Sequence, residues 1–148
     1  MATFVDLVAE ARARNDLSSL VDAIPYHRYL GIKVVELGGE MIATLPSNKK
    51  LIGNPMLPAI HGGVIGAFLE TTAIFHLLSA GKTLHVPKTI TITVDYRRSA
   101  GLVDTYAKGI TTKLGSRIAN VRAEAWQDDP ARPVATANVN FLIEPAKD

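Results

Sequence analysis

A chain of 148 residues with 47% hydrophobic residues has enough apolar material for the core of one domain, and its formal net charge of +2 argues against a nucleic-acid-binding protein. It has no cysteine, which excludes disulfides, thiol catalysis and zinc–cysteine sites. We expect a cytoplasmic protein without a membrane partner, because the N-terminus lacks the basic residues of a signal peptide and the longest apolar stretch, near residues 64–78, is interrupted by polar side chains.

The N-terminal part of the chain is predicted to be helical. Apolar residues recur at helical spacing in residues 3–14, and Ser18 is a candidate N-cap for a short helix over Leu20–Ile24 that ends at Pro25. No internal repeat or linker divides the chain. Residues 1–28 are therefore expected to form a helical extension of a single domain that spans the whole chain.

Two short strands and a long loop are predicted next. Ile32–Leu37 and Glu40–Leu45 have strand-like patterns on either side of Gly38-Gly39, a pair that suits a tight turn. The following segment, Pro46–Ile60, contains three prolines and a glycine. We expect an ordered loop there, without regular secondary structure.

The longest helix is predicted over Val64–Ala80, which contains no proline and is followed by Gly81, a common helix terminator. Its apolar residues occur on almost every side, which is typical of a helix buried inside a protein. After Pro87 the pattern alternates with period two and indicates strands. These strands are predicted at residues 89–96, 103–110, 116–126 and 134–143.

This order of elements fits an α+β fold in which one antiparallel sheet wraps around one central helix. A sheet covered by a single helix leaves other surfaces exposed, so we also expect the protein to form oligomers. In the first strand after the helix, the alternation predicts Ile92 and Tyr96 on one face and Thr89 on the other.

A carboxylate, Glu70, lies in the middle of the apolar helix and is predicted to be poorly hydrated. An unpaired buried carboxylate costs several kcal/mol, so Glu70 should be paired, protonated or functional. Of its helical neighbours Gly66, Ala67, Ala73 and Ile74, three are small, which leaves room for another molecule. The residues alone fit a catalytic carboxylate and a structural one equally well.

Gly62-Gly63 stands where this helix begins. Free N–H groups at a helix start suit an anion or a developing oxyanion, although a glycine pair there is more often only a bend. We interpret the preceding His61 as a residue that fixes the helix start rather than a base, because no nearby carboxylate in the sequence orients it. The other histidines, His27, His76 and His85, lack ligand spacing, so no metal site is expected.

The spacing of Gly62 and Glu70 has a consequence for oligomerisation. Eight residues of helix place them about 12 Å apart, which is too far for both to act on one carbonyl group. If both belong to one active site, they must come from two chains related by a two-fold axis.

Several motifs in the chain are similar to those of hotdog-fold thioesterases. Asn54-Pro55, then His61-Gly62-Gly63, then Glu70 nine positions after the histidine, resemble the branch typified by the phenylacetate-degradation thioesterases. The strand Thr89–Ala100 and the turn Lys113–Arg117 resemble that branch's later strand and its coenzyme-contacting hairpin. The resemblance covers about residues 30–144.

The resemblance implies a hydrolase acting on an acyl-CoA, and the absence of ligand clusters predicts that it needs no metal or redox cofactor. Apolar residues in and near the loop Lys49–Ile60 favour a small aryl or medium-chain acyl group. The resemblance also implies a homodimer at minimum and a homotetramer by extension, with acyl-CoA as the partner. Gly62 would polarise the thioester carbonyl, Asn54 would help place water or the carbonyl, and Glu70 of the partner subunit would be base or nucleophile. The remaining implied residues are His61, which positions the site, Thr89, which holds the water, and Gly63, Tyr96, Arg97, Lys113, Gly115, Ser116 and Arg117, which contact the substrate.

The sequence also departs from the family pattern. Many members of this branch have Asp at the position of Glu70, and an aryl-CoA group that has Glu usually has Thr where this chain has Ile74. Two alternatives stay open: a non-catalytic acyl-CoA-binding protein, and a hotdog dehydratase or hydratase. The second is less favoured because the chain lacks the proline–glycine step that those enzymes have before the helix.

Overall fold

The computed structural model describes residues 1–37 and 39–144. It contains four α-helices and one short 3₁₀ helix in this part of the chain: α1 (Phe4–Arg14), α2 (Ser18–Asp22), α3 (Pro25–Leu30), η1 (Lys49–Leu51) and α4 (Gly62–Ser79). The strands are β1 (Lys33–Leu37), β2 (Glu40–Leu45), β3 (Ile52–Asn54), β4 (Ala59–Ile60), β5 (Lys88–Tyr96), β6 (Thr105–Leu114), β7 (Ile118–Trp126) and β8 (Ala135–Leu142).

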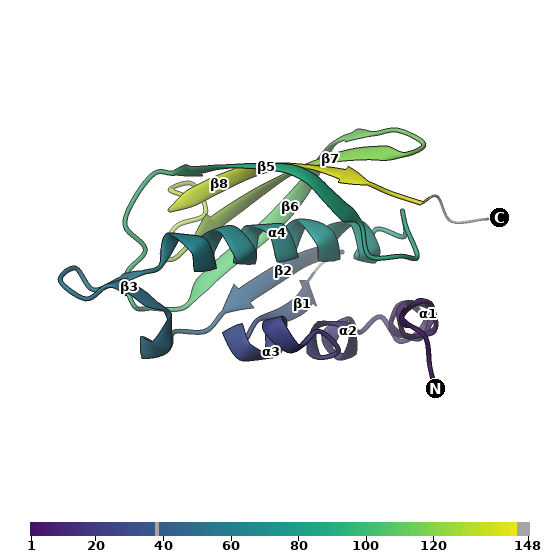
Figure 1. Cartoon of the computed structure of the whole chain (residues 1–148), viewed down its shortest axis with the longest axis horizontal. Helices are drawn as coiled ribbons and strands as arrows, with labels where there is room; N and C mark the ends of the chain where they lie inside the picture. Colours follow the sequence, from purple (N-terminus) through teal and green to yellow (C-terminus); the bar gives the residue numbers. More distant parts are fainter. Residues whose placement is uncertain (38, 145–148) are drawn as a thin grey trace.

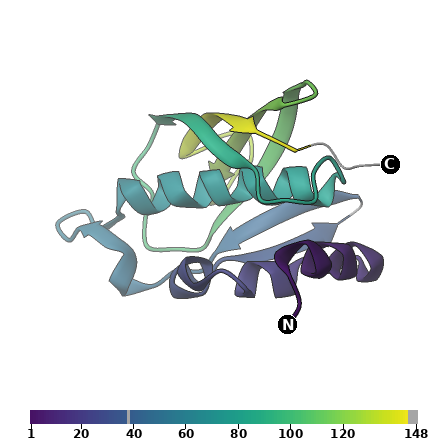
Figure 2. The same ribbon diagram turned by 45° about the vertical axis from the view of Figure 1, so that its right-hand side comes forward.

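Six of these strands form one antiparallel sheet in the order β1-β2-β6-β7-β8-β5. The sheet curves over α4, and the N-terminal helices lie on the far side of α4 beside β1 (Figure 1, Figure 2). The predicted α+β fold, a sheet wrapped around one central helix, is therefore confirmed. The sheet has two edges, β1 and β5.

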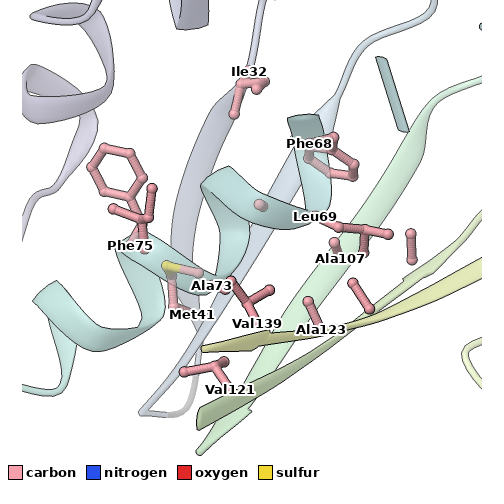
Figure 3. Close-up of a cluster of buried hydrophobic side chains, with 14 of the residues drawn as sticks. Ile32, Met41, Phe68, Leu69, Ala73, Phe75, Ala107, Val121, Ala123 and Val139 are labelled. Carbon is pink, nitrogen blue, oxygen red and sulfur yellow. The ribbon is translucent and has the colours of Figure 1, made fainter. Parts of the chain in front are cut away.

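The core lies between α4 and the inner face of the sheet (Figure 3). The helix contributes large, fully buried side chains, among them Phe68 and Leu69, whereas the fully buried Phe75 packs against His27 of α3 on the side of the N-terminal helices. The facing strands contribute mainly alanine and valine, and these small residues let a helix with large side chains pack close to the sheet. The buried residues on the inner faces of β6, β7 and β8 are Ala107, Ala119, Val121, Ala123, Ala125, Ala135, Ala137, Val139 and Phe141.

By length and composition, α4 also qualifies as a candidate membrane span, with a mean hydropathy of 1.3. However, 56% of it is buried inside the protein. Its apolar character is thus explained by its place at the centre of the fold.

The N-terminal extension contains one more helix than predicted. Pro25 was expected to end a helix, but it is a first-turn residue of α3, where the fixed backbone angle of proline fits and its missing N–H is not needed. Arg12 of α1 fastens the extension to the core. Its guanidinium donates two hydrogen bonds, of 2.8 and 3.0 Å, to the carbonyl oxygen of Leu78, in the last turn of α4.

His27 of α3 is a buried histidine that packs against α4, edge-on to Phe75. The hydroxyl of Thr71 donates to the carbonyl oxygen of Ala67 at 2.8 Å, so it accepts from Nε2–H of His27 at 3.2 Å. The other ring nitrogen, Nδ1, is buried and has no hydrogen-bond partner in the described part of the chain. Burial lowers the pKa of His27 from its ordinary value of 6.5.

This histidine should make stability depend on pH. In the unfolded chain His27 takes up a proton near pH 6.5, whereas in the folded chain it does so only at lower pH. The unfolding free energy should therefore be highest above about pH 6.5 and should fall as the pH is lowered from 7 to 5. His27→Gln keeps an amide donor for Thr71 and cannot titrate, so its unfolding free energy should depend less steeply on pH.

The measurement is urea unfolding at a series of pH values. The control is His85→Gln, since His85 is exposed. The pKa of His76 is also lowered by burial, so the dependence should be reduced in His27→Gln and not abolished. If the unfolding free energy of His27→Gln changes with pH as steeply as that of the native protein, His27 is not the cause of the pH dependence.

Two other predictions are changed by the structure. The loop predicted over Pro46–Ile60 contains η1 and a short antiparallel hairpin, β3–β4. The predicted turn at Gly38-Gly39 falls partly outside the described residues. In β5, a bulge at Ile90 shifts the register, so Thr89 pairs with the inward-facing Phe141 and shares the face of Ile92 and Tyr96. Alternation could not reveal this, since a bulge leaves no period-two signal.

Candidate active site

The start of α4 is fixed by the hairpin that precedes it. The N–H of His61 donates to the carbonyl oxygen of Leu51, and the N–H of Ile60 donates to that of Ala100, each at 2.8 Å. Gly53 of β3 passes so close to His61 that a Cβ at this glycine would lie 2.6 Å from the Cα of His61. Only glycine fits there without backbone movement, so the hairpin and the helix start form one rigid unit.

The first turn of α4 has an unusual set of hydrogen bonds. His61 is the N-cap residue, and its Nδ1 accepts from the N–H of Gly63 at 2.8 Å. The hydroxyl of Tyr96, at the end of β5, donates to the carbonyl oxygen of Gly62 at 2.7 Å. Among the hydrogen bonds of the described residues, none uses the N–H of Gly62. The structure thus agrees with a positioning role for His61 and leaves one donor available at the positive end of the helix dipole.

A cleft of about 390 Å³ opens beside this turn. Its walls combine apolar side chains, including Ile60, Ile65 and Val134, with Arg97 and Arg98. Tyr96 and Gly62 also line it. A second cleft of about 330 Å³ shares Arg98, Ser99 and Val134 with the first, and Arg132 and Asp128 also line it.

The arginines beside these clefts have no carboxylate partner. In the described part of the chain, no Asp or Glu oxygen lies within 4 Å of the guanidinium of Arg97, Arg98 or Arg132. Their charge is therefore available to an anionic ligand. The family resemblance implies a role only for Arg97; the adjacent Arg98 forms a basic pair with it in the sequence, whereas no motif singles out Arg132.

Glu70 lies on the least buried strip of α4, together with Gly63, Gly66 and Ala67. Its side chain is partly exposed in the single chain, not poorly hydrated as predicted, and it makes no hydrogen bond or ion pair with another described residue. The room predicted beside it is partly filled, because the hydroxyl of Tyr96 lies 3.5 Å from the position of a Cβ on Gly66. Small residues thus make a strip along which another surface can approach the helix.

Asn54 stands at the end of β3, near the exposed tip of the hairpin. Its side-chain oxygen accepts from the N–H of Met56 at 3.0 Å and so stabilises the turn. Met56 at the tip is 89% exposed. In the single chain Asn54 therefore shapes the hairpin, and its side-chain NH₂ is the part left for a ligand.

The other predicted substrate-contacting residues lie at the opposite end of the sheet. Thr89 precedes Tyr96 by seven residues in β5, so the two residues lie about 23 Å apart at 3.3 Å per residue. Accordingly, Tyr96 pairs with Ala135 near the start of β8 and Thr89 pairs with Phe141 near its end. The β6–β7 turn lies at the Thr89 end, as Figure 1 and Figure 2 both show. The residues at this far end are Thr89, Lys113, Gly115, Ser116 and Arg117. Within one chain they do not meet Gly62.

The edge strand β5 is exposed along its inner face as well as its free edge. On the inner face, Ile92 is 37% and Tyr96 58% exposed, although both are large. An edge strand of nine residues with exposed apolar side chains is a surface on which another strand can pair. As for metals, no group of three or more His, Asp or Glu residues in the described ranges is arranged to hold an ion.

Comparisons with known proteins agree with this architecture. A model of the thioesterase superfamily matches residues 57–134. A solved structure from Chromobacterium violaceum is 36% identical, with a TM-score of 0.77, over 95% of this chain and 98% of that one. None of the curated proteins compared matches the chain.

Two further solved structures are less similar in sequence. A phenylacetic acid degradation-related protein from Ralstonia eutropha is 19% identical, with a TM-score of 0.69, over 86% of this chain and 98% of that one. A Streptococcus mutans protein bound to acetyl CoA is 18% identical, with a TM-score of 0.67, over 80% and 92%. At these identities the likeness shows the fold alone.

Proposed function

Because the chain belongs to the thioesterase superfamily, we propose that it hydrolyses the thioester of an acyl-CoA to a free acid and CoA, in an active site shared between two copies of the chain. The observation that carries the proposal is the first turn of α4, where the N–H of Gly62 has no acceptor among the described residues. A donor held at the positive end of a helix stabilises a tetrahedral oxyanion.

The second chain supplies the carboxylate. Glu70 lies about 12 Å along α4 from Gly62, so the two cannot act on one carbonyl within a protomer. A two-fold axis that brings Glu70 of one chain to Gly62 of the other passes near Gly66, midway between them. Gly66 has no side chain and lies on the exposed strip of the helix, so two helices can approach closely there.

The same axis accounts for the residues at the far end of the sheet. If the two β5 strands pair antiparallel at the sheet edge, the Thr89 end of one chain lies beside the Tyr96 end of the other. Thr89 and the β6–β7 turn of the partner are then on the same side as Gly62. The predicted substrate-contacting set, separated within one chain, is assembled by two chains.

The chemistry follows from these groups. Glu70 takes a proton from water as the water oxygen attacks the thioester carbon, and the carbonyl oxygen becomes an oxyanion that the N–H of Gly62 stabilises. Collapse of this intermediate breaks the carbon–sulfur bond, and the proton returns from Glu70 to the CoA sulfur. In the alternative route the carboxylate itself attacks the thioester carbon, the carbon–sulfur bond breaks, and the CoA thiolate leaves and takes a proton from water. Hydrolysis of the resulting anhydride then releases the free acid and restores the Glu70 carboxylate. Neither route needs a metal or redox cofactor.

The acyl group is proposed to be a small aryl or medium-chain group. The support is the 390 Å³ cleft, whose apolar walls beside Gly62 include Ile60, Ile65 and Val134. The test is a panel of acyl-CoAs of increasing size with measurement of free-thiol release. Failure to release thiol from any of them, with binding retained, would favour a non-catalytic acyl-CoA-binding protein, and hydration of an enoyl-CoA would favour a hydratase.

The arginines near the cleft should bind the coenzyme's phosphates. Arg97→Gln is expected to raise KM for acyl-CoA about tenfold, with little change in kcat, because a charge-assisted bond to phosphate contributes roughly 1.5–3 kcal/mol when desolvated and less when exposed. KM for the same acyl group on pantetheine, which lacks the nucleotide, should not change.

Arg14→Gln on exposed α1 is the matched control. Lys113→Gln and Arg117→Gln test the contribution of the partner's turn in the same assay. Equal KM values of the native protein for acyl-CoA and acyl-pantetheine would contradict a phosphate site. The homotetramer and the cytoplasmic location expected from the sequence stay predictions.

A further inference from the structure

The peptide unit between Gly62 and Gly63 is held at both of its polar ends. Its N–H, on Gly63, donates to Nδ1 of His61 at 2.8 Å. Its carbonyl oxygen, on Gly62, accepts from the hydroxyl of Tyr96 at 2.7 Å. One partner, His61, is the neighbouring N-cap residue of α4, and the other, Tyr96, comes from the end of β5, 34 positions along the chain from Gly62.

Such a restraint matters here because glycine is the residue with the greatest backbone freedom. Two successive glycines begin α4, and the first turn of a helix lacks the intrahelical hydrogen bonds that hold N–H groups elsewhere. The N–H of Gly62 belongs to the neighbouring peptide unit, which joins the held one at the Cα of Gly62. Fixing one peptide unit therefore limits the directions in which this N–H can point.

We propose that Tyr96 is a positioning residue: together with His61 it clamps the Gly62–Gly63 peptide and so aims the N–H of Gly62 at the reacting carbonyl. The inference rests on the proposed function and assigns Tyr96 a role other than the substrate contact expected from the sequence. It deepens that function by explaining how a flexible glycine pair holds a fixed oxyanion donor.

The packing around Tyr96 fits this role. Its ring carbons lie 3.4 Å from where a Cβ on Gly62 would stand, and its hydroxyl lies 3.5 Å from the same position on Gly66. The ring thus rests on the side of α4 where two glycines make space. Yet Tyr96 is 58% exposed, so packing alone would be served equally by phenylalanine, and the hydroxyl is the part that the clamp requires.

His61 completes the clamp as an acceptor. A nitrogen that accepts a backbone N–H carries no proton, so Nδ1 is the bare nitrogen of the ring. Asparagine is also a good N-cap acceptor for the first turn, whereas alanine is not. The chain therefore offers a conservative replacement that preserves the hydrogen bond without an imidazole.

The main test compares Tyr96→Phe with Tyr26→Phe, a control on exposed α3 that keeps the same chemical change away from the site. Tyr96→Phe is expected to lower kcat for acyl-CoA hydrolysis about tenfold and to leave KM within about twofold, because a misaligned donor stabilises the transition state less. Tyr26→Phe should match the native protein. A rise in KM with unchanged kcat would make Tyr96 a substrate contact and overturn the proposal.

A second arm uses His61. His61→Asn should keep several-fold more kcat than His61→Ala, as N-cap preferences predict. Equal losses in the two variants would mean that the imidazole has a role other than accepting from Gly63, and would overturn this half of the clamp.

Hydrogen exchange of the Gly63 amide, followed by NMR, tests the clamp without catalysis. This amide should exchange measurably faster in Tyr96→Phe and in His61→Ala than in the native protein, and not in Tyr26→Phe. If the native protein hydrolyses no acyl-CoA, the proposed function fails while the exchange rates still decide the clamp. Unchanged exchange in Tyr96→Phe, with unchanged kcat, would refute the clamp and leave the proposed function standing.

Discussion

Gly62→Pro is expected to lower kcat about 10²- to 10³-fold, because proline has no N–H and the oxyanion donor is lost. The fold should tolerate this change. Gly62 is the first helical residue, a position that proline favours, and the ψ of the preceding His61 is 132°, in the range that a residue before proline prefers.

The matched comparison is Gly62→Ala, which adds a Cβ at 3.4 Å from the Tyr96 ring but keeps the N–H. It should lose less than about tenfold in kcat, and any loss common to both variants measures crowding against Tyr96. Circular dichroism and thermal unfolding verify that both variants are folded. Equal kcat in the alanine and proline variants would show that the N–H of residue 62 does not stabilise the oxyanion.

A mixture of two inactive variants is expected to recover about a quarter of the native activity if the active site is shared between chains as proposed. Glu70→Gln should reduce kcat roughly 10³-fold, as expected for loss of a general base or nucleophile, and Gly62→Pro is inactive for the reason given above. In a heterodimer of the two, one site contains an intact Gly62 and an intact Glu70, and the other contains both lesions.

The experiment co-refolds the two variants at equal concentration and assays thiol release, with subunit exchange measured by native mass spectrometry. Random pairing makes half of the dimers mixed, each with one intact site, which gives the quarter. The control mixes Glu70→Gln with Glu70→Ala, which share the same lesion and should recover nothing. Absence of recovery in the first mixture, with exchange confirmed, would place both residues in one chain's site.

The fold could be predicted from the sequence wherever hydrophobic periodicity is strong. The apolar run of α4 and the alternation in β5 to β8 each depend on a repeated contact with one core, so the signal accumulates over many residues. The family signature was also readable, since His61-Gly62-Gly63 and Glu70 are close in sequence. The elements that escaped prediction, α3 and the β3–β4 hairpin, are short. Each makes a hydrogen bond to a distant part of the chain, α3 through His27 and Thr71 and the hairpin through Ile60 and Ala100.

The site was less predictable for a different reason. The hydrogen bond from Tyr96 to Gly62 joins residues 34 positions apart, and no local sequence pattern predicts it. The bulge at Ile90, which turns Thr89 to the inner face, also has no recognisable sequence pattern. The hydration of Glu70 was mispredicted because helical periodicity says how apolar the neighbours are, but not whether the chain itself covers that side of the helix.

The two edges of the sheet differ in length, charge and covering, and this difference limits how many chains can pair edge to edge. The edge strand β1 has five residues with a lysine and a glutamate among them, and α2 packs against it. The edge strand β5 has nine residues, and from Thr89 to Val94 it carries no charge. Molecules with two open sheet edges can pair edge to edge without limit and form a fibre. A molecule with a single open edge has no free edge left once it has paired with a second copy. The proposed pairing through β5 would therefore end with two chains, and the charged, helix-flanked β1 would protect the pair from aggregation at its outer edges.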